Sequence, residues 1–188
     1  MKLSVALKLG RVSNLPTVWS NVLTGTALAG AAMVDSRLLL LLLSLSLFYV
    51  GGMFLNDAFD HSFDAKTRPE RPIPSGEVSA AQVHAFGFGM IAVALVLLAW
   101  AGYRYEPLTQ WRPVVAGLAL AAAIVFYNWH HKNNPLSPLL MGACRMLVYL
   151  AAAWAVSAVI PQQVIVAAVV LLCYLIGLTY AAKKEHLG

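Results

Sequence analysis

An all-α bundle of membrane-spanning helices is the fold class that this sequence predicts, and three observations support it. Of the 188 residues, 60% are hydrophobic and 11% are charged, and the apolar residues gather in six stretches of about span length. A helix needs roughly 20 apolar residues to cross a bilayer, and a backbone in lipid must satisfy its hydrogen bonds in helices or in a closed barrel. The stretches lack the alternation of barrel strands. We therefore expect about six transmembrane helices in a single domain, residues 1–188.

The chain begins with a short amphipathic segment, residues 2–13, of sequence KLSVALKLGRVS. Leu3, Ala6, Leu7 and Gly10 share one helical face, and basic residues surround it, which predicts an interfacial helix on the membrane surface.

The long apolar stretches follow this segment in order. Four of them begin at a proline, which suits the first turn of a helix because the N–H missing there has no intrahelical partner. The predicted spans are residues 16–34, 38–59, 80–101, 113–129, 138–159 and 161–180.

Lysine and arginine are distributed unevenly between the two ends of these spans. Ten lie on the side of both termini and of the loop of residues 60–79, whereas Arg37, Arg104 and Arg112 lie on the other side. By the positive-inside rule, we expect both termini and this loop to face the cytoplasm, in a bacterial-type inner membrane. The net charge of +5 follows mostly from this asymmetry. It suits contact with membrane lipids and requires no nucleic-acid partner.

An acidic motif ends the second predicted span, in the stretch NDAFDHSFDAKTRPERPIPSG, residues 56–76. On a continued helix, Asp57, Asp60 and Asp64 fall within an arc of roughly 60°. Three carboxylates there repel one another, near a helix C-terminus where negative charge is already unfavourable. Mg²⁺ would compensate them, because it takes oxygen ligands from one or two carboxylates and from substrate phosphates. The alternative is a solvated helix end whose aspartates pair with Lys66, Arg68 and Arg71.

The segments NDAFDHSFD and RPERPIPSG together resemble the first aspartate-rich motif, NDxxDxxxD, of the UbiA superfamily of intramembrane prenyltransferases. RVSNLPTVWSNVLTG, residues 11–25, and NPLSPLLMGACR, residues 134–145, are most similar to its EboC-like branch. The resemblance implies part of a UbiA-like nine-helix fold. It also implies Mg²⁺-dependent transfer of a prenyl group from an isoprenyl diphosphate to an aromatic or other lipophilic acceptor. Asn56, Asp57, Asp60 and Asp64 would hold Mg²⁺ against the diphosphate.

Basic and aromatic residues extend this expected site. Arg68 and Arg71 are suited to bidentate contacts with phosphate, or serve as positive-inside anchors. The resemblance also implies a tyrosine and a lysine at YxxxK spacing that assist diphosphate binding. Here His131 stands at the lysine position after Tyr127, and Lys132 comes one place later, so both residues stay candidates.

Two further positions have alternatives that the sequence leaves open. The resemblance implies an asparagine near the diphosphate in the first helix, where Asn14 and Asn21 both qualify, although Asn21 is equally suited to an interhelical hydrogen bond. Arg145, two turns into the fifth span, either pairs with the aspartates or a diphosphate, or extends to the nearby membrane face. We also expect Gly51 and Gly52 to permit close helix packing.

A second acidic motif, which the resemblance implies, is missing, because no aspartate follows Asp64. Glu185 is a weak substitute, and a local ion pair is its favoured role. Three interpretations stay open: an N-terminal part of a longer protein, a naturally short member, and a branch that lost the second metal site. Prenyl transfer is the first function that we expect. Non-catalytic binding or export of an isoprenoid or lipid precursor is the alternative, and a magnesium channel suits the RPIPSG segment poorly.

Overall fold

The computed structural model describes residues 1–32, 35–132 and 134–185. For residues 183–185 it describes the backbone alone. Within those ranges the regular secondary structure is all helical, as the sequence predicts. Its elements are α1 Leu3–Gly10, the 3₁₀ turn η1 Val12–Asn14, α2 Leu15–Leu28, α3 Leu38–Phe59, α4 His61–Thr67, α5 Ala80–Arg104, α6 Arg112–His130, α7 Ser137–Val156 and α8 Gln162–Glu185.

Among the described residues, five helices are long and apolar enough to cross a membrane, namely α3, α5, α6, α7 and residues 162–182 of α8. The predicted span of residues 16–34 is not among these five. The helix predicted at residues 16–34 is α2, which has 14 residues and stops at Leu28. The turn after it contains Gly30, whose positive φ of 89° suits a helix C-terminus. The predicted end of this span, Val34, lies outside the described residues.

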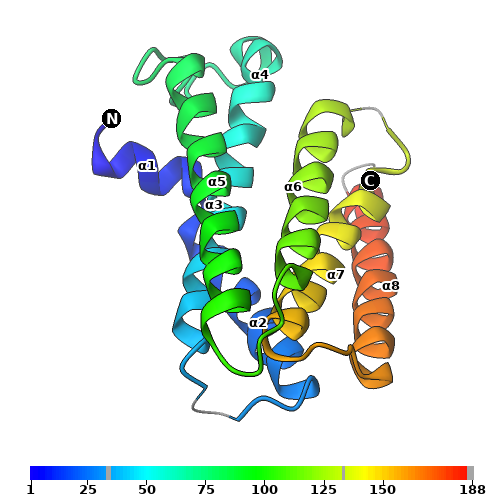
Figure 1. Cartoon of the computed structure of the whole chain (residues 1–188). Coiled ribbons are helices and arrows are strands. Elements are labelled where there is room, and N and C mark those ends of the chain that lie inside the picture. Colours follow the sequence, from blue (N-terminus) through cyan, green and yellow to red (C-terminus); the bar gives the residue numbers. More distant parts are fainter. Residues whose placement is uncertain (33–34, 133, 186–188) are drawn as a thin grey trace.

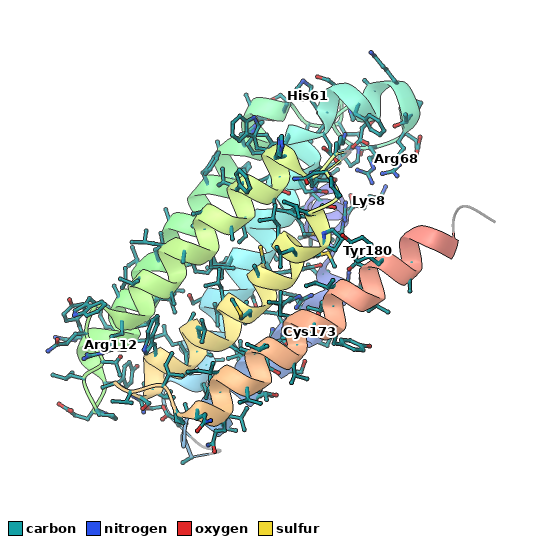
Figure 2. The ribbon with its side chains drawn as sticks, turned by 90° about the vertical axis from the view of Figure 1, so that its right-hand side faces the viewer. Lys8, His61, Arg68, Arg112, Cys173 and Tyr180 are labelled. Atoms are coloured by element: carbon teal, nitrogen blue, oxygen red, sulfur yellow. The ribbon has the colours of Figure 1, made fainter. Side chains whose placement is uncertain are left out.

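Successive bundle helices run in opposite directions, so their connections gather at two ends (Figure 1). α4 lies at one end, towards which the N-terminus and the last turns of α8 also lie, and the α5–α6 and α7–α8 connections lie at the other. Figure 2 shows His61 and Arg68 at the first end and Arg112 at the opposite one. This arrangement matches the division of basic residues between the two ends of the spans.

The bundle core depends on close contacts between α3 and its neighbours. α3 and α5 pack side by side (Figure 1), and a Cβ on Gly51 would lie 2.8 Å from the carbonyl oxygen of Gly87. A Cβ on Gly52 would lie 3.2 Å from Ile124 on α6. The packing role predicted for both glycines is thus confirmed. Fully buried Leu45, Phe48 and Leu120 fill the space between these helices.

α1 crosses the bundle rather than running along it (Figure 1). It buries Val5 and Leu9 in a small cluster with Phe54 and other apolar side chains, whereas Leu3 and Leu7 are exposed. The exposed leucines suit insertion into a membrane surface, and the interfacial position of α1 stays a prediction.

Candidate functional site

The acidic motif lies at a break between two helices. α3 ends at Phe59, Asp60 separates it from α4, and Asp64 lies within α4. The continuous helical extension predicted from the sequence is therefore wrong. On one straight helix the three carboxylates would share a face and repel one another. The break instead lets Asp60 face a different set of cations from Asp57 and Asp64.

Asp57 and Asp64 are joined by one arginine. The Nη1 atom of Arg71 lies 3.2 Å from Oδ1 of Asp57 and 2.7 Å from Oδ2 of Asp64. Arg11, which follows α1, adds a contact of 3.1 Å to the same Oδ1 of Asp57. Asp57 is 7% exposed and Asp64 is 1% exposed. Two buried carboxylates thus depend on basic residues from two separate segments of the chain.

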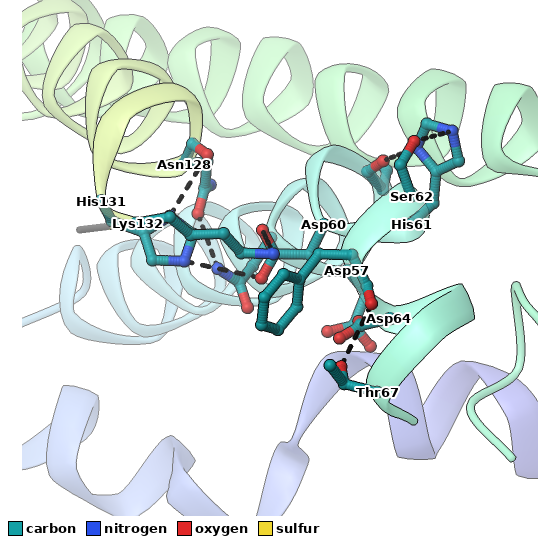
Figure 3. Close-up of polar contacts among 12 residues, drawn as sticks. Asp57, Asp60, His61, Ser62, Asp64, Thr67, Asn128, His131 and Lys132 are labelled. Carbon is teal, nitrogen blue, oxygen red and sulfur yellow. Dashed lines mark hydrogen bonds and ion pairs between the residues drawn. The ribbon is translucent and has the colours of Figure 1, made fainter. Parts of the chain in front are cut away.

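Asp60 is paired with the residues that follow α6 (Figure 3). Nζ of Lys132 lies 3.0 Å from its Oδ1, and Nε2 of His131 lies 3.5 Å from its Oδ2. The Lys132 ammonium also lies 3.6 Å from the ring centroid of Phe63. Burial by itself would raise the pKa of Asp60, but its hydrogen bonds with His131 and Lys132 outweigh burial and lower it. The same bond to Asp60 raises the pKa of His131.

The segment after α4 positions Arg71. Its backbone is closed by hydrogen bonds from the N–H groups of Ser75 and Glu77 to the carbonyls of Arg71 and Pro72, and Gly76 has a positive φ of 80°. Ser79 then caps α5 by accepting a hydrogen bond from the N–H of Gln82. Glycine adopts this left-handed backbone without strain, so Gly76 allows the tight turn at this point. Arg68 is exposed at the same end of the bundle as His61 (Figure 2), so Arg71 is the arginine of the motif that reaches the aspartates.

Amide side chains connect this cluster to α6. Nδ2 of Asn56 donates to Oδ1 of Asn128 at 3.1 Å, and Nδ2 of Asn128 donates to the carbonyl of Gly52 at 3.1 Å. Arg11 donates to Oδ1 of Asn56 at 3.3 Å. Arg11 and Asn128 were absent from the predicted site. An asparagine near the end of an apolar helix, next to Tyr127, was the available signal for Asn128.

An apolar cavity of about 350 Å³ opens beside the cluster. Its wall is formed by side chains such as Phe48, Met53, Leu120 and Ile124. The polar residues that line it include Arg11, Asn14, Tyr49, Asn56, Tyr127, Asn128 and Arg145. A volume of this size accommodates a small hydrophobic ligand with a polar head.

The remaining predicted site residues differ in whether they line the cavity. Among the described residues, Asn14 and Tyr127 line the cavity, whereas Asn21 is buried on α2 and does not. The ring of Tyr127 stacks on His131, with centroids 5.0 Å apart. Arg145 lines the cavity but bonds Thr17, with Nη2 2.9 Å from Oγ1. The side chain of Glu185 lies outside the described part of the structure.

The carboxylates suit a hard divalent cation better in pairs than as a trio. Within the described residues, no group of three His, Cys, Asp or Glu side chains is arranged to hold a metal ion. Asp57 and Asp64, however, converge on one nitrogen of Arg71, and Oδ1 of Asp64 is buried there with no hydrogen-bond partner in the described part of the chain. Mg²⁺ commonly uses one or two carboxylates and completes its shell with water and substrate phosphate. This donor pair therefore fits Mg²⁺.

A sequence comparison decides the family. The UbiA prenyltransferase family matches residues 18–186, most of the chain. The chain belongs to the UbiA prenyltransferase family. The UbiA membership agrees with the NDxxDxxxD motif and with its position at the end of a membrane-spanning helix.

Curated relatives of this UbiA chain include two archaeal enzymes named digeranylgeranylglyceryl phosphate synthase. The enzyme of Metallosphaera sedula is 30% identical over 122 residues, which cover 64% of this chain and 40% of the relative. The enzyme of Methanopyrus kandleri is 32% identical over 131 residues, which cover 69% of this chain and 45% of the relative. The chain thus spans less than half the length of these relatives.

A solved structure of a digeranylgeranylglyceryl phosphate synthase in membranes shares the UbiA fold seen here. Its TM-score is 0.79 at 22% identity, over 93% of this chain and 60% of the other. Together with the five apolar helices, this similarity of fold identifies an integral membrane protein with a UbiA-like helical bundle.

Proposed function

We propose that this protein transfers a prenyl group from an isoprenyl diphosphate to a lipophilic acceptor within the membrane, with Mg²⁺ as cofactor. The observation that carries the proposal is the apolar cavity beside a cluster of buried aspartates and basic side chains. An isoprenyl diphosphate has the matching composition, because its head is polyanionic and its tail is hydrocarbon. Family membership supports transfer rather than binding alone.

The proposed roles follow from the contacts. Asp57 and Asp64 would hold Mg²⁺, which when bound neutralises the diphosphate and stabilises it as a leaving group. Arg71 and Arg11 already lie against these carboxylates, so short movements of their side chains would bring them to phosphate oxygens. Lys132 lies against Asp60 and supplies a further positive charge. Positive groups placed at a departing diphosphate lower the barrier to its departure.

The cavity would bind the hydrocarbon tail and exclude water from the reacting carbon. Water exclusion protects a carbocation-like species from hydrolysis and strengthens the nearby electrostatic contacts. Asn56 and Asn128, which bond each other, line the cavity beside the aspartate cluster and would position the head group at its entrance.

We also propose the placement of this site on the cytoplasmic side of a bacterial-type inner membrane, with both termini on that side. The excess of basic residues at the end that carries His61 and Arg68 supports this orientation. The printed names of the relatives support an acceptor of lipid character. The similarity to the EboC-like branch stays a prediction.

The first experiment measures thermal unfolding of the detergent-solubilised protein with geranylgeranyl diphosphate. We expect stabilisation with Mg²⁺ and little or none with EDTA, because the proposed contact to the diphosphate needs the metal. Asp57→Asn and Asp64→Asn should each remove the part of the thermal stabilisation that depends on Mg²⁺. Glu70→Gln, an exposed acidic residue in the same loop, is the matched control and should keep it. Equal stabilisation in Mg²⁺ and in EDTA would exclude the metal bridge.

The second experiment separates transfer from binding. Purified protein, Mg²⁺ and radiolabelled geranylgeranyl diphosphate are incubated with a lipid extract of host membranes, and labelled lipid products are separated by chromatography. Prenyl transfer predicts a labelled product that depends on Asp57 and Asp64. Donor binding with no product from any lipid fraction would instead favour a non-catalytic binding function.

A further inference from the structure

The short helix α1 has apolar side chains on two opposite sides. Val5 and Leu9 are buried against the bundle, with 2% and 0% of their surfaces exposed. Leu3 and Leu7 are 75% and 47% exposed. Because successive residues turn by about 100°, Val5 lies about 200° around the helix from Leu3, and the two pairs face opposite ways. The bundle therefore shelters one pair, and the other pair needs a second apolar environment.

The buried side of α1 lies against the last turns of α3. A Cβ on Gly10 would lie 3.1 Å from Val50, and Ala58 belongs to the same buried cluster as the inner side of α1. These two α3 residues lie within about three turns of the end of that helix at Phe59. At this level α1 crosses the bundle rather than running along it (Figure 1). Since α3 is long enough to span the membrane, α1 lies near one membrane surface.

The charges of the N-terminal region are all positive. Residues 1–34 contain Lys2, Lys8 and Arg11 and no acidic residue. Lys2 and Lys8 are exposed, and Lys8 lies towards the end of the bundle that carries Arg68 (Figure 2). A short helix with exposed leucines and lysines inserts its apolar side below the lipid head groups and attracts anionic lipid. The surface of α1 therefore matches an anionic leaflet better than a neutral one.

α1 is also joined directly to the proposed diphosphate site. Arg11 is its C-cap residue, with a φ of 44° in the left-handed region that residues other than glycine rarely adopt. The Nη2 atom of Arg11 donates to Oδ1 of Asn56 at 3.3 Å and to Oδ1 of Asp57 at 3.1 Å. Because Arg11 follows the helix without an intervening linker, the position of α1 on the bundle sets the position of this arginine in the site.

We propose that α1 binds anionic phospholipids of the leaflet at its end of the bundle, and that this contact holds Arg11 against Asn56 and Asp57. Lipid on the outer side of α1 and apolar packing on its inner side both favour the docked position of the helix. Arg11 is then kept where it adds positive charge for the donor diphosphate. Anionic lipid thus strengthens donor binding from outside the site. This last step rests on the proposed function, whereas lipid binding by α1 does not.

The first test measures lipid binding without donor. Thermal unfolding of the full chain in neutral detergent is followed with added phosphatidylglycerol or with phosphatidylcholine of the same acyl chains. We expect phosphatidylglycerol to raise the unfolding temperature more. Lys2→Gln and Lys8→Gln should each weaken phosphatidylglycerol binding about fivefold, because each removes a positive charge from the lipid-facing helix. Equal stabilisation of the wild type by both lipids would overturn the proposal.

The matched control for these lysine variants is Arg104→Gln. It removes the same charge from an exposed position at the last residue of α5, at the other end of the bundle, and should bind phosphatidylglycerol like the wild type. A loss in Arg104→Gln as large as in the lysine variants, or no loss in the lysine variants, would place the lipid elsewhere and overturn the proposal.

The second test measures donor affinity in lipid nanodiscs with Mg²⁺. The concentration of geranylgeranyl diphosphate that gives half-maximal thermal stabilisation should be severalfold lower in nanodiscs that contain phosphatidylglycerol than in phosphatidylcholine alone. Simple repulsion between the anionic lipid and the anionic donor would act in the opposite direction. The double variant Lys2→Gln, Lys8→Gln should lose this difference, and in neutral detergent it should bind the donor like the wild type. A donor affinity of the wild type that is independent of lipid would overturn the coupling.

Arg11→Gln separates the two halves of the proposal. This variant should bind the donor equally weakly in both kinds of nanodisc, and it should keep its preference for phosphatidylglycerol in the first test. A donor affinity of Arg11→Gln that still rises with phosphatidylglycerol would show that Arg11 does not carry the coupling. Failure of the proposed function has a different signature, since geranylgeranyl diphosphate would then give no Mg²⁺-dependent stabilisation in any lipid, and the lipid preference without donor would be unchanged.

Discussion

Lys132 places its Nζ atom 3.0 Å from Oδ1 of Asp60, although it stands one position beyond the spacing expected after Tyr127. α6 ends at His130, and His131 is its C-cap residue with helical backbone angles. Lys132 lies beyond this cap, so the usual helix spacing no longer places it. His131, which occupies the expected position, contacts the other oxygen of the same carboxylate at 3.5 Å. Both candidates therefore contact Asp60. We expect Lys132 to supply a positive charge to phosphate and His131 mainly to orient Asp60.

Lys132→Met should weaken geranylgeranyl diphosphate binding in the presence of Mg²⁺ about tenfold, because a charge-assisted contact to phosphate is lost. His131→Asn should have a smaller effect, since its ring stacks on Tyr127 and mainly orients Asp60. The measurement is the donor concentration that gives half-maximal thermal stabilisation. Lys8→Met, which changes an exposed lysine on α1, is the control. Equal losses in the two variants would contradict this division of roles.

Asn128→Leu should destabilise the folded protein rather than the ligand complex alone. Asn128 accepts a hydrogen bond from Asn56 and donates one to the carbonyl of Gly52, all in buried surroundings. Leucine fills a similar volume but leaves these groups without a partner, at about 1–3 kcal/mol for each unsatisfied group. The unfolding midpoint without ligand measures the effect. Trp129→Leu, at the exposed neighbouring position, should change it much less, and a similar fall in both variants would contradict the prediction.

The sequence predicts the bundle well because long apolar stretches report membrane spans directly. α2 is the exception, because Asn21, Thr24 and Thr26 dilute its apolar character and Gly30 ends it early. The motif aspartates were found from their pattern, but several of the side chains that contact them come from other parts of the chain. Arg11 and Asn128 are 46 and 71 residues from Asp57 in the sequence. Such pairings follow from helix packing, which local spacing does not encode.

Asp35→Asn should destabilise the protein at neutral pH by about 3 kcal/mol, because it removes the counter-ion of a buried arginine. Oδ2 of Asp35 lies 2.6 Å from Nη2 of Arg37, whose Nη1 donates to the carbonyl of Ala155. The hydrogen bond from Arg37 lowers the pKa of Asp35 below its ordinary value of 3.8. The contribution of Asp35 is therefore complete above that value and is lost as the pH falls through the lowered pKa.

The wild type and Asp35→Asn are compared by chemical unfolding in detergent over a series of pH values. Their difference should be largest near neutral pH and should shrink on acidification. Glu106→Gln changes an exposed acidic residue at the same end of the bundle and should have little effect at any pH. A difference between wild type and Asp35→Asn that is constant across the series would show that the ion pair is not its source.

Gly51→Ala should destabilise the contact between α3 and α5, whereas Gly89→Ala should be tolerated. A Cβ at position 51 would lie 2.8 Å from the carbonyl oxygen of Gly87, so the two backbones must separate to admit a methyl group. Overpacking of this kind costs about 1–3 kcal/mol. Gly89 lies on α5 as well, but a Cβ there meets nothing within 4 Å, and alanine favours the helix over glycine. The unfolding midpoints of both variants in detergent measure the difference, and equal tolerance of alanine at the two positions would show that α3 and α5 adjust without cost.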